Sequence, residues 1–416
     1  MPTTELFNGI AIIIDDEIGK ESKINNIINQ IEEKNIPCVK YTQLPDPKII
    51  NHLQGVSFLL LDWTILTEDL QSSILDGVKI PDELKSKLID ENISFLKSLM
   101  EKCFAPVFIF SNESPSYIIS KLKENDLYSD DKPNFIFVKR KSDIDDDKLF
   151  AEINSWIQTT PSIYALKAWE KEYGKAKNLL FLDFYNMSHS WPTILWNNFE
   201  NDGVNTSREL GEIISRNLHT RMTPFSFHED YLDIKDPDIE MDEIRKVIEG
   251  ERFISNHRLH SDSILAGDVF GENNKEVYLN IRPDCDCIPD RSKGDSTLDD
   301  VKLYLIRGDR ITFKKESDSY IKRYGNFSEQ ENTAFVFSMI AGRSYVFRFK
   351  DILIADWKDY KDKRIGRLLP PHITRIQQRY SFYLQRQGLP RTPEVAVNNE
   401  RNSLKEMFKL MEKLSV

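Results

Sequence analysis

Five residues in the first 140 positions have the side-chain types that phosphoryl-group chemistry needs. They are Asp15, Asp16, Asp62, Ser111 and Lys139. Three carboxylates held close together repel one another, and a shared divalent cation, best Mg²⁺ where all ligands are oxygens, keeps them ionised at neutral pH. One carboxylate can then attack phosphorus while the metal and a lysine neutralise charge on the phosphoryl oxygens. A serine hydroxyl can donate a hydrogen bond to one of those oxygens.

Each of these residues lies at the end of a short apolar run. The runs are Ile10–Asp16, Phe58–Asp62, Val107–Ser111 and Phe135–Lys139. Continuous β-branched and aromatic runs of this length, separated by helix-length amphipathic stretches, indicate buried parallel strands that alternate with helices. The polar ends of such strands meet at the carboxyl edge of an open sheet, where ligands bind. We therefore predict an α/β domain that gathers the five residues at one edge.

In type, order and strand context these residues resemble the receiver domain of bacterial two-component response regulators. In that family an acidic pair follows the first strand, a phospho-accepting Asp ends the third, a Ser or Thr ends the fourth and a Lys ends the fifth. The resemblance implies that Asp62 accepts the phosphoryl group and shares Mg²⁺ with Asp15 and Asp16. It also implies that Ser111 and Lys139 contact that group. It covers residues 1–160 and implies a flavodoxin-like, doubly wound parallel five-stranded sheet and a partner histidine kinase.

Length and composition limit the classes of protein to consider. A chain of 416 residues predicts two or three domains, and 40% hydrophobic residues with 11% aromatics indicate packed cores. The formal net charge of −11 argues against a broad nucleic-acid surface. Because no apolar run approaches the roughly 20 residues of a membrane span and no signal-peptide pattern opens the chain, we expect a cytoplasmic protein. The four cysteines do not form a disulfide framework.

The pattern along the chain predicts four parts. They are a receiver domain at 1–160, a helical linker or dimerisation region at 161–251, a β-rich domain at 252–355 and a C-terminal helical region at 356–416. The β-rich part, a small barrel or curled sheet, rests on the short runs Val277–Arg282, Leu303–Ile306, Thr333–Met339 and Ser344–Phe349.

A second group of potential ligands lies in the β-rich part: His257, His260, Asp268, Cys285 and Cys287. A histidine with both thiolates would suit zinc, and a cysteine with a histidine base would suit nucleophilic catalysis. The single residue between the two cysteines is shorter than the two-residue gap of a zinc knuckle. The simpler interpretation is that these residues have only a structural role at the end of a strand.

The C-terminal region concentrates positive charge and aromatic rings. Lys361–Arg367 is followed by four arginines and three interleaved aromatics, which are Arg375, Arg379, Arg386, Arg391, Tyr380, Phe382 and Tyr383. Such a pattern would contact nucleic acid, or it would pack its rings on the β domain and its arginines against the acidic surface of the same chain. The tail Glu400–Leu414 has the pattern of an amphipathic helix suited to docking or self-association.

Together these features favour a phosphorelay signalling protein. Its receiver would take a phosphoryl group on Asp62 from a histidine kinase and relay or buffer the signal to a protein effector or a second copy. Receivers with unusual output regions resemble those of bacterial antiphage phosphorelays. One alternative is a degenerate-receiver scaffold with a metal- or nucleic-acid-binding C-terminal domain, and another is an effector enzyme using His260, Asp268 and Cys285. No motif of a familiar autonomous enzyme is recognised.

Overall fold

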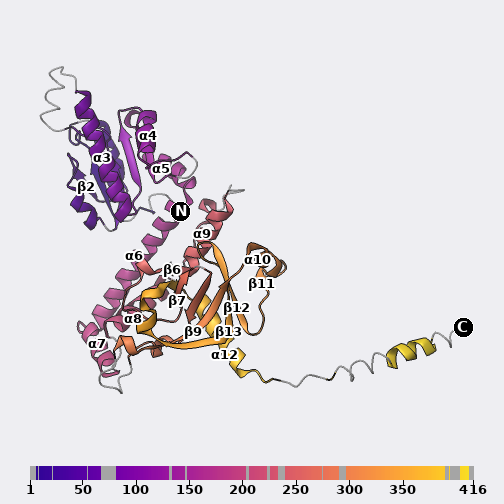
Figure 1. Cartoon of the computed structure of the whole chain (residues 1–416). Helices are drawn as coiled ribbons and strands as arrows, with labels where there is room; N and C mark the ends of the chain where they lie inside the picture. Colours follow the sequence, from indigo (N-terminus) through magenta and orange to yellow (C-terminus); the bar gives the residue numbers. More distant parts are fainter. Residues whose placement is uncertain are drawn as a thin grey trace. The chain divides into compact units, whose positions relative to one another are not determined.

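The computed structural model divides the chain into two compact units, Met1–Pro237 and Asp238–Val416, and each is described by itself (Figure 1). The residues that the structure describes are 6–7, 9–20, 22–53, 55–66, 81–130, 134–145, 148–202, 206–222, 225–232, 239–273, 275–289, 297–388, 393 and 403–411. No helix in this described part of the chain combines the length and apolar character needed to cross a membrane.

Unit 1 is built on a parallel five-stranded sheet. Its strands are β1 (Ile10–Ile14), β2 (Cys38–Tyr41), β3 (Val56–Leu61), β4 (Val107–Ser111) and β5 (Ile136–Arg140). The strand order β2-β1-β3-β4-β5 is that of a flavodoxin-like doubly wound fold, as predicted. The order reverses between β1 and β3, so the crevice outside their carboxyl ends is the topological switch point of the sheet.

Helices cover both faces of this sheet, which explains why its strands are continuous apolar runs. The helices are α1 (Ser22–Glu33), α3 (Asp82–Lys102), α4 (Pro115–Glu124) and α5 (Leu149–Gln158). Alternate strand residues enter two separate cores. Ala11, Phe58 and Phe108 pack with α1 and α5, whereas Ile12 and Leu59 pack with α3 and α4.

Three further helices follow in unit 1: α6 (Pro161–Met187), α7 (Trp191–Asp202) and α8 (Thr206–Met222). The start of α6 belongs to the core of the sheet, because Ile163, Tyr164 and Ala168 join the cluster that contains α5. The predicted boundary at residue 160 therefore falls inside one packed core and is corrected. Farther along, α6 and α7 expose large apolar side chains, among them Leu182 and Ile194.

Unit 2 contains a curled antiparallel seven-stranded sheet with the order β12-β13-β9-β8-β7-β14-β6 (Figure 1). Its strands are β6 (Phe253–Ser255), β7 (Asp268–Asn273), β8 (Glu276–Asn280), β9 (Lys302–Arg310), β12 (Thr333–Ile340), β13 (Arg343–Asp356) and β14 (Arg364–Leu368). Several pairings contain register shifts, which increase twist and bend a sheet. This is the curled sheet that the sequence predicts for this part of the chain.

Two helices pack on this sheet: α9 (Met241–Arg252) against β6 and β12, and α12 (His372–Gln385) against β12. Between β9 and β12 the chain forms α10 (Phe313–Ser319) and a small hairpin, β10 (Tyr320–Ile321) with β11 (Asn326–Phe327). After β13 follows the short α11 (Trp357–Tyr360).

Two predicted boundaries in this part are corrected. Helix α9 falls in unit 2 rather than in the helical linker, and β14 extends the sheet past residue 355 into the region expected to be helical. Residues 403–411 are helical and exposed, and the rest of the predicted tail helix, like Arg391, lies outside the described residues.

Candidate functional site

Three carboxylates meet at the switch point of the unit 1 sheet. Asp15 and Asp16 follow β1, and Asp62 follows β3, where its backbone N–H donates to the carbonyl of Ile14 at 2.9 Å. All three side chains are buried, and each offers an oxygen within 4.8 Å of the others. Among the described residues, no other group of three His, Cys, Asp or Glu side chains approaches so closely.

The basic partner of this acid cluster (Asp15, Asp16 and Asp62) is Lys141. Its Nζ lies 2.7 Å from Asp62 Oδ2 and 2.8 Å from Asp15 Oδ2, and the side chain is fully buried. The sequence pattern predicts Lys139 at this place, and that prediction is wrong. Lys139 instead forms an ion pair with Glu152 of α5 at 2.7 Å.

The position of β5 explains the error. The apolar run ends at Val138, but β5 continues through Lys139 and Arg140. Because β5 is an edge strand, these polar side chains can face solvent: Lys139 is partly exposed and Arg140 is exposed. The first residue after the strand is Lys141, just as Asp62 is the first residue after β3. The triplet Lys139-Arg140-Lys141 contained this signal, but the true end of the strand was needed to use it.

The carboxyl groups and the lysine of this site shift one another's pKa values. Burial, and next the nearby Asp62 carboxylate, raise the pKa of the Asp15 carboxyl to about 7, although Lys141 lowers it. Burial alone lowers the pKa of Lys141, but attraction by Asp62 and Asp15 outweighs it and the net shift is upward. Lys141 Nζ also lies 3.4 Å from Glu17 Oε2, so its ammonium group is shared among three carboxylates. The all-oxygen donor set of the three clustered aspartates fits Mg²⁺.

The loop that follows Asp62 is held in place by hydrogen bonds. The Thr64 backbone N–H donates to Asp62 Oδ1 at 3.2 Å, and the buried Asn92 of α3 donates through Nδ2 to the Trp63 carbonyl at 2.7 Å. Asn92 was not identified from the sequence, because its role depends on a contact across 29 residues. Ser111 ends β4, which pairs with β3, and its side chain is also buried. It therefore lies at the same carboxyl edge of the sheet as Asp62, as the sequence predicts.

The second predicted group of ligands is not brought together. Asp268 is fully buried and bound by Arg367, with Nε to Oδ1 at 2.6 Å, while Arg364 lies 3.7 Å away. The ring of His260 accepts a hydrogen bond from the backbone N–H of Asp262 at 3.2 Å, and its carbonyl accepts one from Arg364 at 2.9 Å.

The two cysteines of that group differ in their surroundings. Cys287 is buried beside Asn280, whose Nδ2 lies 3.6 Å from its sulfur, and burial raises the pKa of the Cys287 thiol to about 11. Cys285 is exposed, as is His257. Within the described residues these side chains do not form a three-ligand group of the kind made by the acid cluster.

The basic and aromatic residues of α12 make contacts within unit 2. Arg375 and Arg379 both pair with Glu329, and the rings of Tyr380 and Tyr383 lie 5.7 Å from that of Phe349. These contacts match the interpretation in which the rings pack on the β domain and the arginines face acidic groups of the same chain.

Comparisons with known proteins do not assign this chain to a family. A scan against protein-family models finds no match to this sequence, and a search of curated proteins finds no match either. The functional conclusion therefore rests on the parallel sheet order and on the geometry of the acid cluster with Lys141.

Proposed function

We propose that unit 1 is a receiver domain that accepts a phosphoryl group on Asp62 from a partner histidine kinase. The observation that carries this proposal is the contact of Lys141 with Asp62 and Asp15, inside a buried carboxylate cluster at the switch point. The lysine expected of a receiver is then Lys141 instead of Lys139. Asp15, Asp16 and Asp62 would hold Mg²⁺.

In this reaction a carboxylate oxygen of Asp62 attacks the phosphorus of the donor. A new P–O bond forms as the P–N bond to the kinase histidine breaks, and the histidine nitrogen keeps the electron pair of that bond. Lys141, already at hydrogen-bond distance from Asp62, supplies positive charge beside the phosphoryl oxygens. Ser111 offers a hydroxyl donor from the adjacent strand. Bound Mg²⁺ would neutralise further charge on the same oxygens.

Phosphorylation would change the charge that Lys141 and the Asp62 loop experience. The ion pairs of Lys141 would be shared with the new phosphoryl oxygens, and Lys141 begins the short 3₁₀ turn Lys141–Asp143 that leads toward α5. Because α6 packs in the same core as α5, a shift of this segment would reach the helices that follow. We propose that these helices and unit 2 relay or buffer the signal.

The two alternatives receive less support. A scaffold with a degenerate receiver needs no intact acid cluster, yet here three carboxylates and a lysine are assembled in a buried site. An effector enzyme using His260, Asp268 and Cys285 would need Asp268 to be available, but both arginines of β14 engage it.

The test is intact-mass spectrometry after incubation of the full chain with Mg²⁺ and acetyl phosphate. We expect one added phosphoryl mass in the wild type, none in Asp62→Asn and none in EDTA. Asp90→Asn, which changes an exposed carboxylate on α3, should behave as the wild type does.

Two results would contradict the proposal. An adduct that persists in Asp62→Asn would place the acceptor elsewhere. A wild type that binds Mg²⁺ and is folded but takes no phosphoryl group, either from acetyl phosphate or from a panel of phosphorylated histidine kinases, would support the scaffold instead.

A further inference from the structure

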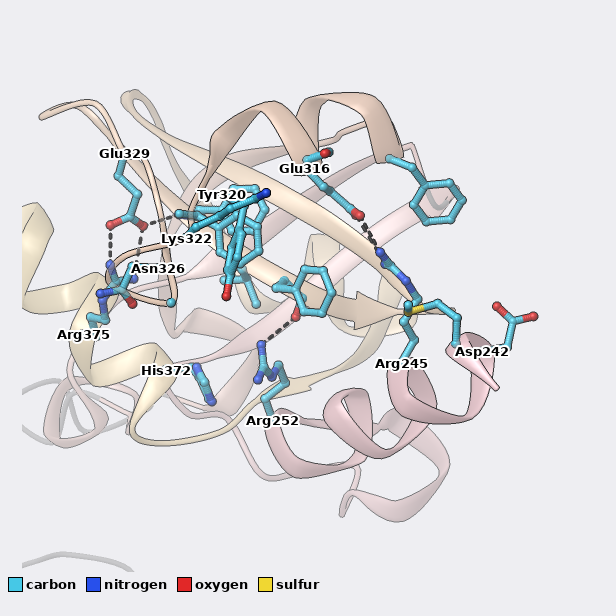
Figure 2. A pocket seen from close by; sticks show the side chains of 18 residues that line it. Asp242, Arg245, Arg252, Glu316, Tyr320, Lys322, Asn326, Glu329, His372 and Arg375 are labelled. Atoms are coloured by element: carbon cyan, nitrogen blue, oxygen red, sulfur yellow. Dashed lines mark hydrogen bonds and ion pairs between the residues drawn. The ribbon is translucent and has the colours of Figure 1, made fainter. Parts of the chain in front are cut away.

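Unit 2 contains a cavity of about 880 Å³ that the phosphoryl site does not use. It is lined by α9, by α10 with the β10–β11 hairpin, by β12 and by the start of α12 (Figure 2). Its volume lies within the range of about 300–1,000 Å³ that is typical of small-molecule sites. The cavity therefore has room for a ligand, and its lining indicates which kind.

One side of the cavity offers an aromatic surface. The ring of Tyr320 extends into the cavity from the hairpin and is 46% exposed (Figure 2). Its centroid lies 5.4 Å from that of Phe327, which stacks on Phe335 at 4.1 Å with an interplanar angle of 12°. Because packed rings fix its position from behind, Tyr320 is suited to stack against a planar ligand.

The opposite side carries basic groups. Arg252, at the end of α9, and His372, at the start of α12, line the cavity and lie below Tyr320 in this view (Figure 2). Arg252 donates through Nη1 to the Phe337 carbonyl at 2.8 Å, whereas its Nη2 makes no hydrogen bond to any described residue. Lys322 is exposed beside Tyr320 and forms no ion pair within the described part of the chain.

The acidic groups of the lining are neutralised or turned away. Glu316 is buried in an ion pair with Arg245 at 2.6 Å, and Glu329 is bound by both Arg375 and Arg379. Asp242 points away from the cavity (Figure 2). Glu251 lies behind the basic side, 3.1 Å from both Arg252 and His372, and is half exposed. Glu251 therefore already pairs with Arg252 and His372, and Lys322 is the basic side chain of the lining that forms no ion pair within the described part of the chain.

We propose that this cavity binds a nucleotide, with the base stacked on Tyr320 and the phosphate close to Lys322, Arg252 and His372. A nucleotide combines the two chemistries that the lining offers, since its base is a flat aromatic surface and its phosphate accepts hydrogen bonds from guanidinium and ammonium groups. This proposal is independent of the phosphoryl site, because none of these residues belongs to unit 1.

The experiment is isothermal titration calorimetry on the full chain, in EDTA so that Mg²⁺ does not direct phosphates to the acid cluster. The probes are the four ribonucleoside mono- and triphosphates, the matching nucleosides and tripolyphosphate. We expect binding of at least one nucleotide and at least tenfold weaker binding of its nucleoside and of tripolyphosphate.

Variants locate the site. Tyr320→Ala should weaken nucleotide binding by about tenfold, the typical scale of one lost base–aromatic stack, while Tyr320→Phe keeps the ring and should stay within about twofold. Lys322→Ala should weaken it by roughly fivefold, and more at low salt. The matched controls are Tyr324→Ala, in the same hairpin but outside the lining, and Lys314→Ala on α10. Asp62→Asn should leave nucleotide binding unchanged.

Three outcomes would overturn the proposal. The first is no binding of any nucleotide at millimolar concentration by a folded wild type. The second is equal binding by wild type, Tyr320→Ala and Lys322→Ala. The third is binding of tripolyphosphate as tight as that of every nucleotide, which would leave an anion site without base recognition.

Discussion

Asp62 in unit 1 and Asp268 in unit 2 are both buried carboxylates next to basic side chains, but their surroundings have opposite charge balance. Asp62 shares Lys141 with the carboxylates of Asp15 and Glu17. Asp268 stands alone between the guanidinium groups of Arg364 and Arg367.

The donors around Asp268 are also occupied. Arg364 donates to Asn256 Oδ1 at 2.7 Å and to the Ser263 and His260 carbonyls at 2.5 and 2.9 Å, and Arg367 donates to the Ser263 carbonyl at 2.8 Å. Such a cluster is closed, because its charges and donors have partners within the protein. In the acid cluster of unit 1, by contrast, three carboxylates offer oxygens within 4.8 Å of one another, and that difference separates a structural ion pair from the candidate site for a cation and a phosphoryl group.

The largest expected effect comes from breaking the closed cluster. Asp268→Ala leaves two buried arginines without their carboxylate and should lower the free energy of unfolding of unit 2 by about 3–5 kcal/mol. Urea denaturation followed by tryptophan fluorescence measures this loss. Asp262→Ala, an exposed neighbour, should change it by less than about 0.5 kcal/mol. A loss below about 1 kcal/mol in Asp268→Ala would mean that Arg364 and Arg367 do not depend on this carboxylate.

The next effect concerns which lysine serves the acid cluster. Lys141→Ala should slow phosphorylation by acetyl phosphate at least about 100-fold, because a preorganised charge next to the reacting group is lost. Lys139→Ala should stay within about twofold, since its side chain pairs with Glu152. Time courses of intact mass measure both rates. The reverse ranking would restore the assignment made from the sequence.

A smaller effect should come from the metal itself. Mg²⁺ at 100 times its dissociation constant should stabilise unit 1 by about 2.7 kcal/mol, because the folded cluster binds it and the unfolded chain does not. Differential scanning calorimetry with Mg²⁺ or EDTA detects the shift. Asp16→Ala should reduce it strongly, and Asp268→Ala should leave it intact. An equal shift in Asp16→Ala would place Mg²⁺ outside the acid cluster.

The smallest effect concerns how the Asp62 loop is held. Asn92→Ala removes the hydrogen bond to the Trp63 carbonyl and leaves a buried acceptor without its donor, which should cost about 1–2 kcal/mol of unfolding free energy. Glu91→Ala, on the exposed side of the same helix, is the control for helix substitution. If the two variants lose the same stability, α3 does not anchor this loop.

The unit 1 sheet was predictable because both of its faces are buried. Strands such as Ile10–Ile14 and Val56–Leu61 are apolar at nearly every position, and this pattern needs no knowledge of their neighbours. β14 was not predictable in the same way. Its sequence contains Arg364 and Arg367, and arginine usually lies on a protein surface. Both are buried here because Asp268, almost 100 residues earlier in the chain, pairs with them.

By itself, the sequence determined the parallel α/β architecture of unit 1 and the gathering of Asp15, Asp16, Asp62 and Ser111 at one edge, since local apolar runs set the strands and strand ends share an edge. Only the tertiary structure decided that Lys141 reaches the carboxylates, that arginines occupy Asp268 and that a hairpin, three helices and β12 line a cavity in unit 2. The physical reason is the same in each case. These features depend on where an edge strand ends and on which distant side chains meet, and neither is encoded in a short stretch of sequence.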